Sequence, residues 1–228
     1  MNKIITLIVL ICCIFLTGCN SMSIGIIGGD DGPTAIYVND DNIRKSYDID
    51  KLFYEKYIDE KTLPILDLHI DREYVSQDRK LILDDSIENG IEHLIYEFYH
   101  NSTSGLFENI YKIIAGENLT NAIKSDENNF NDGIYYSEIL IDEIDLVDKD
   151  ELDNISENNQ VRIIDILNEL KMDKFAIVEV ECSIKHNDKS LSMAPQVGNG
   201  DISRYYLVGK AADEYKICEV FWEGFIND

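Results

Sequence analysis

Three strand-like segments near the C-terminus constrain the fold more than any other feature of this chain. From Ala176 to Ile184 every second side chain is apolar, and Glu179 and Glu181 lie between these positions. This alternation is typical of a strand with one buried and one solvated face. Residues 205–210 and 215–222 are also strand-like, and the short segment between them suits a hairpin connection. We therefore expect an antiparallel sheet that needs a hydrophobic layer against one face.

Further strands are expected earlier in the chain. Residues 63–70 and 74–83 show alternating apolar and polar side chains, which predicts a strand pair. Residues 135–147 are predicted to form a long strand, and their apolar positions change sides partway, which indicates a β-bulge. The segments 125–133 and 187–203 are polar, so we expect them to be loops.

Three segments have the period of an amphipathic helix. The clearest starts at residues 84–86, where Glu88 completes a capping-box pattern, and its apolar stripe runs to Phe98. Shorter apolar stripes lie in residues 106–114 and 161–170. The predicted order is therefore a strand pair, two helices, a strand, a third helix and a run of antiparallel strands, and each helix needs a core to pack against.

These elements predict an α+β domain, with helices packed on one face of a curved, mainly antiparallel sheet. Their order resembles the NTF2-like and cystatin-like families, an architecture that recurs in exported bacterial lipoproteins. The resemblance implies a pocket between helices and sheet, used by some members for catalysis and by many for binding or assembly. We expect the domain to span residues 62–228, after a tether and a polar connecting region with one short helix in residues 19–61.

The chain is strongly acidic, which excludes one class of partner. It has 20 Lys and Arg residues against 44 Asp and Glu residues, a net charge of −24. A field of this sign repels phosphate backbones and anionic headgroups, so we expect no nucleic-acid partner. The same acidity is typical of an exported domain that must stay soluble.

Residues 1–18 are typical of a secretory signal peptide. Lys3 gives a positive start, and the apolar run from Ile4 to Leu16 is shorter than the roughly 20 residues that span a membrane as a helix. Leu16-Thr17-Gly18-Cys19 then resembles the lipobox of bacterial lipoproteins. The resemblance implies cleavage before Cys19, lipid attachment at its thiol, and anchoring on the extracytoplasmic face of the cell membrane of a Gram-positive-type bacterium. An ordinary signal peptide or a short N-terminal anchor is the alternative.

Residues 24–38 place a glycine-rich turn between two apolar flanks, which favours a β-hairpin. The string GIIGGDDGPT within them resembles a segment of the β subunit of sodium-translocating decarboxylases, with alanine there in place of Asp30. In that family the aspartate that matches Asp31 is implicated in sodium passage. The rest of this chain lacks the family's transmembrane helices, so we interpret the segment as a hairpin or docking peptide, with sodium binding at Asp31 as a further option.

Two sets of side chains are candidate metal ligands. His93, Glu97 and His100 share one face of the predicted helix and have the chemistry that binds divalent cations. For calcium, the acidic loop offers Asp126, Asn128, Asn129 and Asp132. That loop lacks the glycine and the bidentate glutamate that a calcium loop requires. A solvated helix face and a solvated loop are the structural alternatives.

The sequence contains no recognised catalytic set and no cofactor motif. Cys182 and His186 share one predicted strand, but four residues of strand place them roughly 13 Å apart, beyond the reach of a nucleophile and its base. Two cysteines remain after Cys19, namely Cys182 and Cys218. They are either small buried hydrophobic side chains or a disulfide, which export would permit. The aromatic residues of the last two strands are expected in the core, with some lining a pocket or an interface.

Three functions remain open. The first is a non-enzymatic, membrane-anchored domain that binds a protein or a small ligand, and it follows from the lipobox, the single domain and the missing catalytic set. The second is an enzyme that uses a pocket of an NTF2-like fold, which requires titratable groups that converge in that pocket. The third is an accessory protein of a sodium-translocating decarboxylase, which rests on residues 24–38 alone.

Overall fold

The computed structural model describes residues 49–226 apart from Leu68, Gln196 and Glu223. The described chain forms one six-stranded sheet whose strands follow one another in sequence order. The strands are β1 (Glu73–Ser76), β2 (Arg79–Leu83), β3 (Tyr136–Leu146), β4 (Lys174–His186), β5 (Gly200–Ala211) and β6 (Glu214–Trp222). All neighbouring strands are antiparallel except β2 and β3, which are parallel because the helical segment between them carries the chain back across the sheet.

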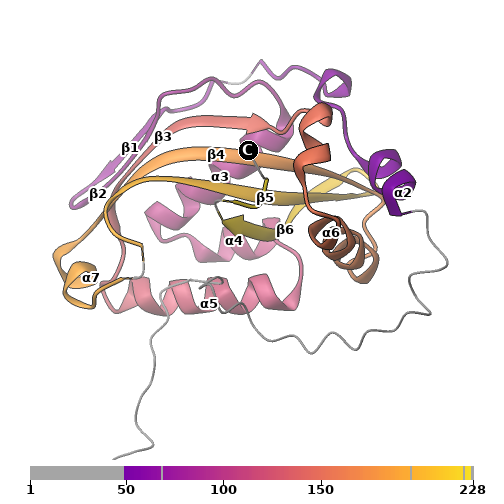
Figure 1. Cartoon of the computed structure of the whole chain (residues 1–228). Helices are drawn as coiled ribbons and strands as arrows, with labels where there is room; N and C mark the ends of the chain where they lie inside the picture. Colours follow the sequence, from indigo (N-terminus) through magenta and orange to yellow (C-terminus); the bar gives the residue numbers. More distant parts are fainter. Residues whose placement is uncertain (1–48, 68, 196, 223, 227–228) are drawn as a thin grey trace, which may run out of the picture.

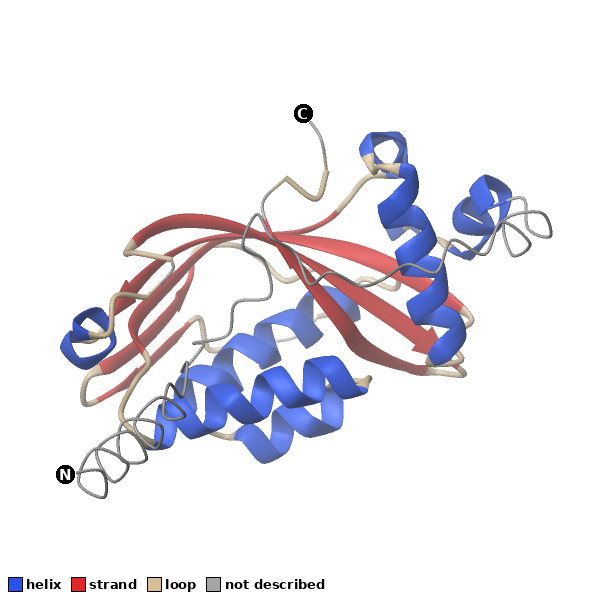
Figure 2. Ribbon diagram, turned by 60° about the horizontal axis from the view of Figure 1, so that its bottom comes forward, coloured by secondary structure: helices blue, strands red, loops and turns tan. Residues whose placement is uncertain are grey.

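The helices lie on both faces of this sheet. They are α2 (Ile49–Lys56), α3 (Gly90–Ser104), α4 (Phe107–Ile113), α5 (Glu117–Asn131), α6 (Glu157–Glu169) and α7 (Asp188–Ser192). Two 3₁₀ turns are also present: η1 (Glu60–Thr62) lies between α2 and β1, and η2 (Lys149–Asn154) lies between β3 and α6. Figures 1 and 2 show α3, α4 and α5 together beneath the sheet, with α2 and α6 at one end and α7 at the other. The predicted α+β class, with helices packed on a mainly antiparallel sheet, is confirmed.

Two hydrophobic cores lie on opposite faces of β4. Val178, Val180 and Cys182 belong to the core under α3, α4 and α5, whereas Phe175 and Ile177 belong to the core under α6 and α2. The alternation along this strand therefore produces two buried faces at the α6 end, since both of its registers are apolar there. The region that contains α2 also packs onto the domain, because Phe53 and Tyr57 are buried in the second core.

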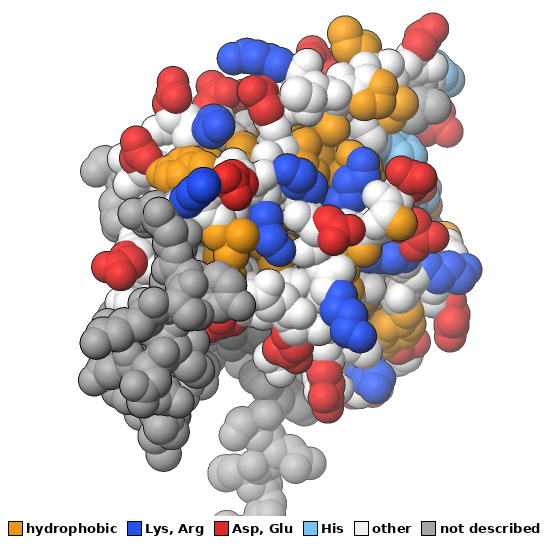
Figure 3. Space-filling view, turned by 90° about the vertical axis from the view of Figure 1, so that its right-hand side faces the viewer, with side chains coloured by type: hydrophobic (Ala, Val, Ile, Leu, Met, Phe, Trp, Pro, Cys, Tyr) orange, Lys and Arg blue, Asp and Glu red, His pale blue; other side chains and the backbone are white. Residues whose placement is uncertain are grey.

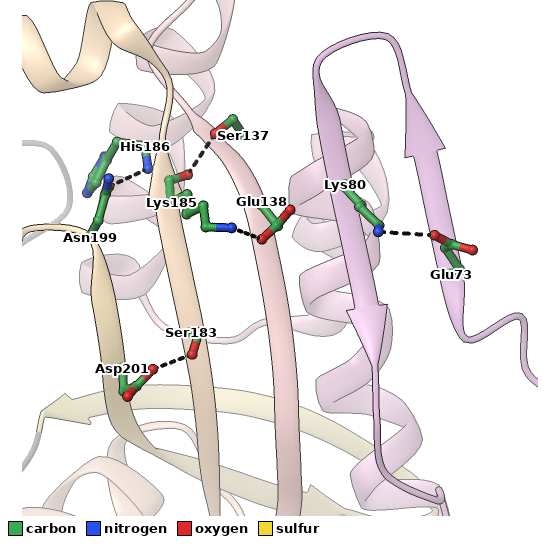
Figure 4. A network of polar contacts seen from close by, with 9 residues as sticks. All are labelled: Glu73, Lys80, Ser137, Glu138, Ser183, Lys185, His186, Asn199 and Asp201. Atoms are coloured by element: carbon green, nitrogen blue, oxygen red, sulfur yellow. Dashed lines mark hydrogen bonds and ion pairs between the residues drawn. The ribbon is translucent and has the colours of Figure 1, made fainter.

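At the α7 end of the sheet, helices cover one face and the other face is exposed. There the outward side chains of β3, β4 and β5 are polar, and Figure 4 shows Lys185 paired with Glu138 and Ser183 donating to Asp201. Acidic and basic side chains are likewise interspersed over the face at the α2 and α6 end in Figure 3. The domain thus has three layers at the α2 and α6 end, with helices on both faces of the sheet, and two layers at the α7 end.

The first long helix begins later than the sequence indicates. Its N-cap is Asn89, whose side-chain oxygen accepts hydrogen bonds from the backbone N–H groups of Ile91 and Glu92. Glu92 accepts the N–H of Glu88 in return, so the capping box lies four residues beyond the predicted one. Asp85, expected at the helix start, instead accepts a backbone N–H of β3.

Two other predictions of local structure are wrong. Residues 63–70 form no strand, because β1 and β2 pair with each other across a turn at Gln77 and leave Ile65 exposed. Residues 125–133 are expected as a loop but belong mostly to α5. Burial of apolar side chains along α5, among them Leu119 and Ile123, outweighs the weak helix propensity of its Asn, Asp and Ser residues.

Two further predictions are wrong in part: residues 74–83 are divided between β1 and β2, and the predicted loop 187–203 contains α7 and the start of β5. The predictions for β3 and for the C-terminal strands are confirmed. β3 has the expected irregularity: its register with β4 shifts between Tyr136 and Glu138 and again between Ile141 and Glu143. The strands β4, β5 and β6 cover the three C-terminal segments, and α6 covers the last apolar stripe. Cys182 and Cys218 are both buried and free, and they lie in different cores on opposite faces of the sheet. The disulfide alternative is therefore excluded.

Candidate functional site

A cavity of about 110 Å³ lies between α3, α5 and the two-layered end of the sheet. Its wall is largely aromatic, with Phe98 from α3, Phe107 from α4 and Phe130 from α5. Tyr136 at the start of β3 and Arg204 near the start of β5 contribute from the sheet. An apolar cavity with a few inward polar groups is the usual form of a small-molecule site.

Three polar atoms in this wall have no hydrogen-bond partner. They are Thr103 Oγ1, Asn129 Nδ2 and Arg204 Nε, and they are the buried side-chain N and O atoms without a partner in the described part of the chain. Each such atom costs about 1–3 kcal/mol when it is desolvated without compensation. Their convergence from α3, α5 and β5 on one cavity identifies it as the candidate functional site.

Arg204 supplies the positive charge of the cavity. It shares a strand face with Tyr206, which places its side chain on the α3 side of the sheet. Its Nη2 donates a long hydrogen bond of 3.4 Å to the Tyr136 hydroxyl, and its guanidinium carbon lies 4.6 Å from the centre of the Trp222 ring. Burial opposes its charge, but the phenol groups of Tyr206, Tyr99 and Tyr136 raise the pKa of Arg204 above its ordinary value. The guanidinium is therefore cationic throughout the physiological pH range.

A chain of buried polar contacts lies behind Arg204. The Tyr206 hydroxyl donates to the Tyr99 hydroxyl at 2.8 Å, and Tyr99 Oη lies 3.9 Å from Cys182 Sγ. Burial raises the pKa of Tyr206 to about 12 and raises that of Tyr99 well above its usual value. Burial likewise raises the pKa of the Cys182 thiol, although the nearby Arg204 charge partly offsets it. At neutral pH these groups are uncharged, so they do not neutralise the guanidinium.

His186 and Ser190 form a pair at the α7 side of the cavity. His186 Nε2 lies 2.9 Å from the Val197 carbonyl oxygen, so this nitrogen carries the proton, and Nδ1 accepts a hydrogen bond from Ser190 Oγ at 2.6 Å. Burial, together with the Arg204 charge, lowers the pKa of His186. This hydrogen bond is the arrangement found between a serine nucleophile and its histidine base.

Its surroundings favour a structural role for this pair. Ser190 is only 1% exposed, and its backbone N–H donates to Asn187 Oδ1 at the start of α7. An imidazolium ion, which a general base must become, is opposed by burial and by the positive charge of Arg204. The pair therefore stabilises the packing of the segment after β4 against the cavity wall.

The candidate ligand residues that lie in the described part of the chain do not come together as a site. His93, Glu97 and His100 lie on α3, where the His100 ring contacts that of Tyr74 at 5.2 Å, and the described residues contain no group of three or more His, Cys, Asp or Glu side chains that could hold a metal. The calcium prediction fails with the predicted loop, because three of its four members lie on α5 and Asp132 is the C-cap.

The N-terminal predictions concern residues outside the described chain. Cys19 and Asp31 both precede Ile49, where the description begins. Within the described residues, no helix has the length and apolar character to cross a membrane. Lipid attachment at Cys19 and sodium binding at Asp31 therefore stay predictions.

Sequence reasoning missed the residues that define the cavity. Arg204 had a detectable signal, since it occupies the apolar register of β5 between Ile202 and Tyr206. Thr103 and Asn129 had none, because a polar residue in an amphipathic helix reads as solvated unless the tertiary packing is known. Trp222, placed among the aromatic residues of the last hairpin, proves to lie against Arg204.

The fold and the cavity define an α+β domain with a partly open, largely aromatic cavity that contains the Arg204 side chain in its wall. No protein-family model, curated protein or solved structure matches this chain.

Proposed function

We propose that this chain is an exported, lipid-anchored binding protein whose domain holds a small organic ligand in the cavity between α3, α5 and the sheet. The observation that carries the proposal is the convergence of three unpartnered polar atoms, on Thr103, Asn129 and Arg204, in one aromatic cavity. Proteins pair nearly all buried polar groups, so three exceptions at one place are best explained by a ligand that supplies the partners. The lipobox supports the location at the membrane.

A blocking variant tests the cavity. Ser102 lines it from α3, and Ser102→Trp places a large side chain into the space that a ligand would occupy. Ser192→Trp is the matched control, because Ser192 is exposed on α7 and does not line the cavity. Both proteins are purified at full length in a non-ionic detergent and screened by thermal denaturation against a library of neutral, cationic and anionic small molecules.

We expect some compounds to raise the melting temperature of the unmodified protein and of Ser192→Trp, but not of Ser102→Trp, since a ligand stabilises only the state that binds it. A library in which no compound stabilises the unmodified protein contradicts a ligand-binding cavity. So does stabilisation that Ser102→Trp retains in full.

The anchor has a separate test. A Cys19→Ser variant, expressed beside the unmodified chain, is expected to lose incorporation of labelled fatty acid and to leave the membrane fraction, because its side chain has no thiol to alkylate. Labelled fatty acid retained by Cys19→Ser would contradict the lipobox interpretation.

A further inference from the structure

The charge balance of the cavity identifies the chemistry of its ligand. Arg204 forms no ion pair with any carboxylate among the described residues. Asp126 is the acidic residue of the described wall, and it is half-buried. In a chain of net charge −24, a half-buried arginine with a buried Nε and no carboxylate partner is unexpected, because charges withdrawn from water are normally paired.

The neutral neighbours of Arg204 do not replace a counter-ion. The Tyr136 hydroxyl accepts one long hydrogen bond, and the Trp222 ring offers a cation–π contact. His186 has both ring nitrogens engaged, by Val197 and Ser190, and so contributes no negative charge. Arg204 Nε, whose N–H is a donor only, has no acceptor.

The other two unpartnered atoms have the same preference. Asn129 Nδ2 is a donor, and the Thr103 hydroxyl is able to donate. The cavity therefore presents donors from three elements and one positive charge, surrounded by the aromatic rings of Phe98, Phe107 and Phe130. The chemistry that satisfies this set is an anionic acceptor carried on an apolar body.

We infer that the cavity binds a small monocarboxylate, with its carboxylate on Arg204 and the donors of Thr103 and Asn129, and its apolar body among the aromatic rings. This inference rests on the proposed binding function. A planar carboxylate matches the fork of a guanidinium, and its negative charge is opposite to that of Arg204. A dianion such as a phosphonate would leave an uncompensated negative charge in the same space.

Matched pairs of acids and amides test the inference. Benzoate, phenylacetate and hexanoate are titrated beside benzamide, phenylacetamide and hexanamide, and phenylphosphonate serves as the dianionic probe. Binding to the full-length protein is followed by calorimetry and by the fluorescence of Trp222, the chain's single tryptophan, which lies against Arg204. We expect at least one acid to bind about tenfold or more tightly than its amide, and benzoate to bind more tightly than phenylphosphonate.

The variant Arg204→Met shows whether the preference depends on this cation. We expect it to weaken binding of the preferred acid by about tenfold or more and to weaken binding of the amide less, because the amide carbonyl also accepts from Arg204 but carries no charge. Arg162→Met is the control, since Arg162 is also seated on an aromatic ring but pairs with Glu219 in the other core. It is expected to leave both affinities unchanged.

The outcomes separate the inference from the proposed function. Amides that bind as tightly as their acids, a preference that survives in Arg204→Met, or tighter binding of phenylphosphonate overturns the monocarboxylate and leaves a ligand-binding cavity in place. Failure of every acid and amide to bind overturns the monocarboxylate. The blocking variant Ser102→Trp then decides the proposed function by the separate library screen.

Discussion

Replacing Arg204 by methionine is expected to stabilise the ligand-free protein. Methionine keeps the length of the apolar stem and removes the charge. The penalty for holding an unpaired ion out of water is several kcal/mol when the ion is fully buried, and it is smaller for the half-buried Arg204 side chain. Against it stand the contact with Trp222, worth about 0.5–2 kcal/mol, and the long bond to Tyr136, worth about 0.5–1 kcal/mol. The free energy of unfolding should therefore rise by about 1–3 kcal/mol.

A matched substitution in the other core should have the opposite sign. Arg162 Nη2 lies 3.2 Å from Glu219 Oε2, and its guanidinium carbon lies 5.0 Å from the Phe221 ring centre. Arg162→Met leaves the buried Glu219 carboxylate without its partner. Because the Arg162 side chain is 40% exposed, solvent screens part of the loss, and we expect a destabilisation of about 1–3 kcal/mol.

Urea unfolding of both variants, followed by circular dichroism at neutral pH, measures the two changes. If Arg204→Met lowers stability as much as Arg162→Met does, Arg204 has a structural counter-ion, and its assignment as the cation of a ligand site is wrong. An unchanged slope with denaturant is required for the comparison, because the two states must expose the same surface.

Three further changes have defined outcomes. Thr103→Val removes an unpartnered hydroxyl without a change of shape and should raise the free energy of unfolding by about 1 kcal/mol in urea, and a loss of stability would show that the hydroxyl is bonded. Burial raises the pKa of Glu92 to about 7, so the folded state binds more protons between the ordinary glutamate pKa and pH 7, and stability should fall as pH rises through this window. In urea titrations at pH 5 and pH 8, Glu92→Gln should remove roughly 2 kcal/mol of this difference in the free energy of unfolding. A pH dependence as large as that of the unmodified protein would contradict this assignment. Gly105 has φ +78°, and a Cβ there would lie 2.6 Å from the Phe130 ring. Gly105→Ala should therefore lower the melting temperature and, because Phe130 in the cavity wall is displaced, weaken ligand binding. Ser104→Ala should do neither.

The parts of the fold that could be predicted are those with long periodic patterns. The alternation in residues 175–184 predicts β4, because a two-residue period over that length has no competing interpretation. The start of α3 could not be placed, since residues 84–86 and Asn89 both carry capping signals and only tertiary contacts decide between them. In α5 the composition of residues 125–133 indicates a loop, and the burial of apolar neighbours along the same helix overrides it.

The candidate site was far less accessible from the sequence. Its members come from α3, α5 and β5, so no local spacing joins Thr103, Asn129 and Arg204. The sequence suggested ligands where charged residues cluster, as in His93 and Glu97, but those side chains sit on a partly solvated helix face. What marks the cavity is that Thr103 Oγ1, Asn129 Nδ2 and Arg204 Nε have no hydrogen-bond partner, and that property exists only in three dimensions.

The uneven covering of β4 and β5 has a consequence for how a ligand enters. Near Phe175 these strands are held from both faces, whereas near His186 one face meets solvent. Amide protons of both strands near Phe175 should exchange only on global unfolding, and those near His186 through smaller local openings. The half that lines the cavity is thus able to open and close while the other half keeps all strands in register, so that ligand exchange requires no loss of the fold.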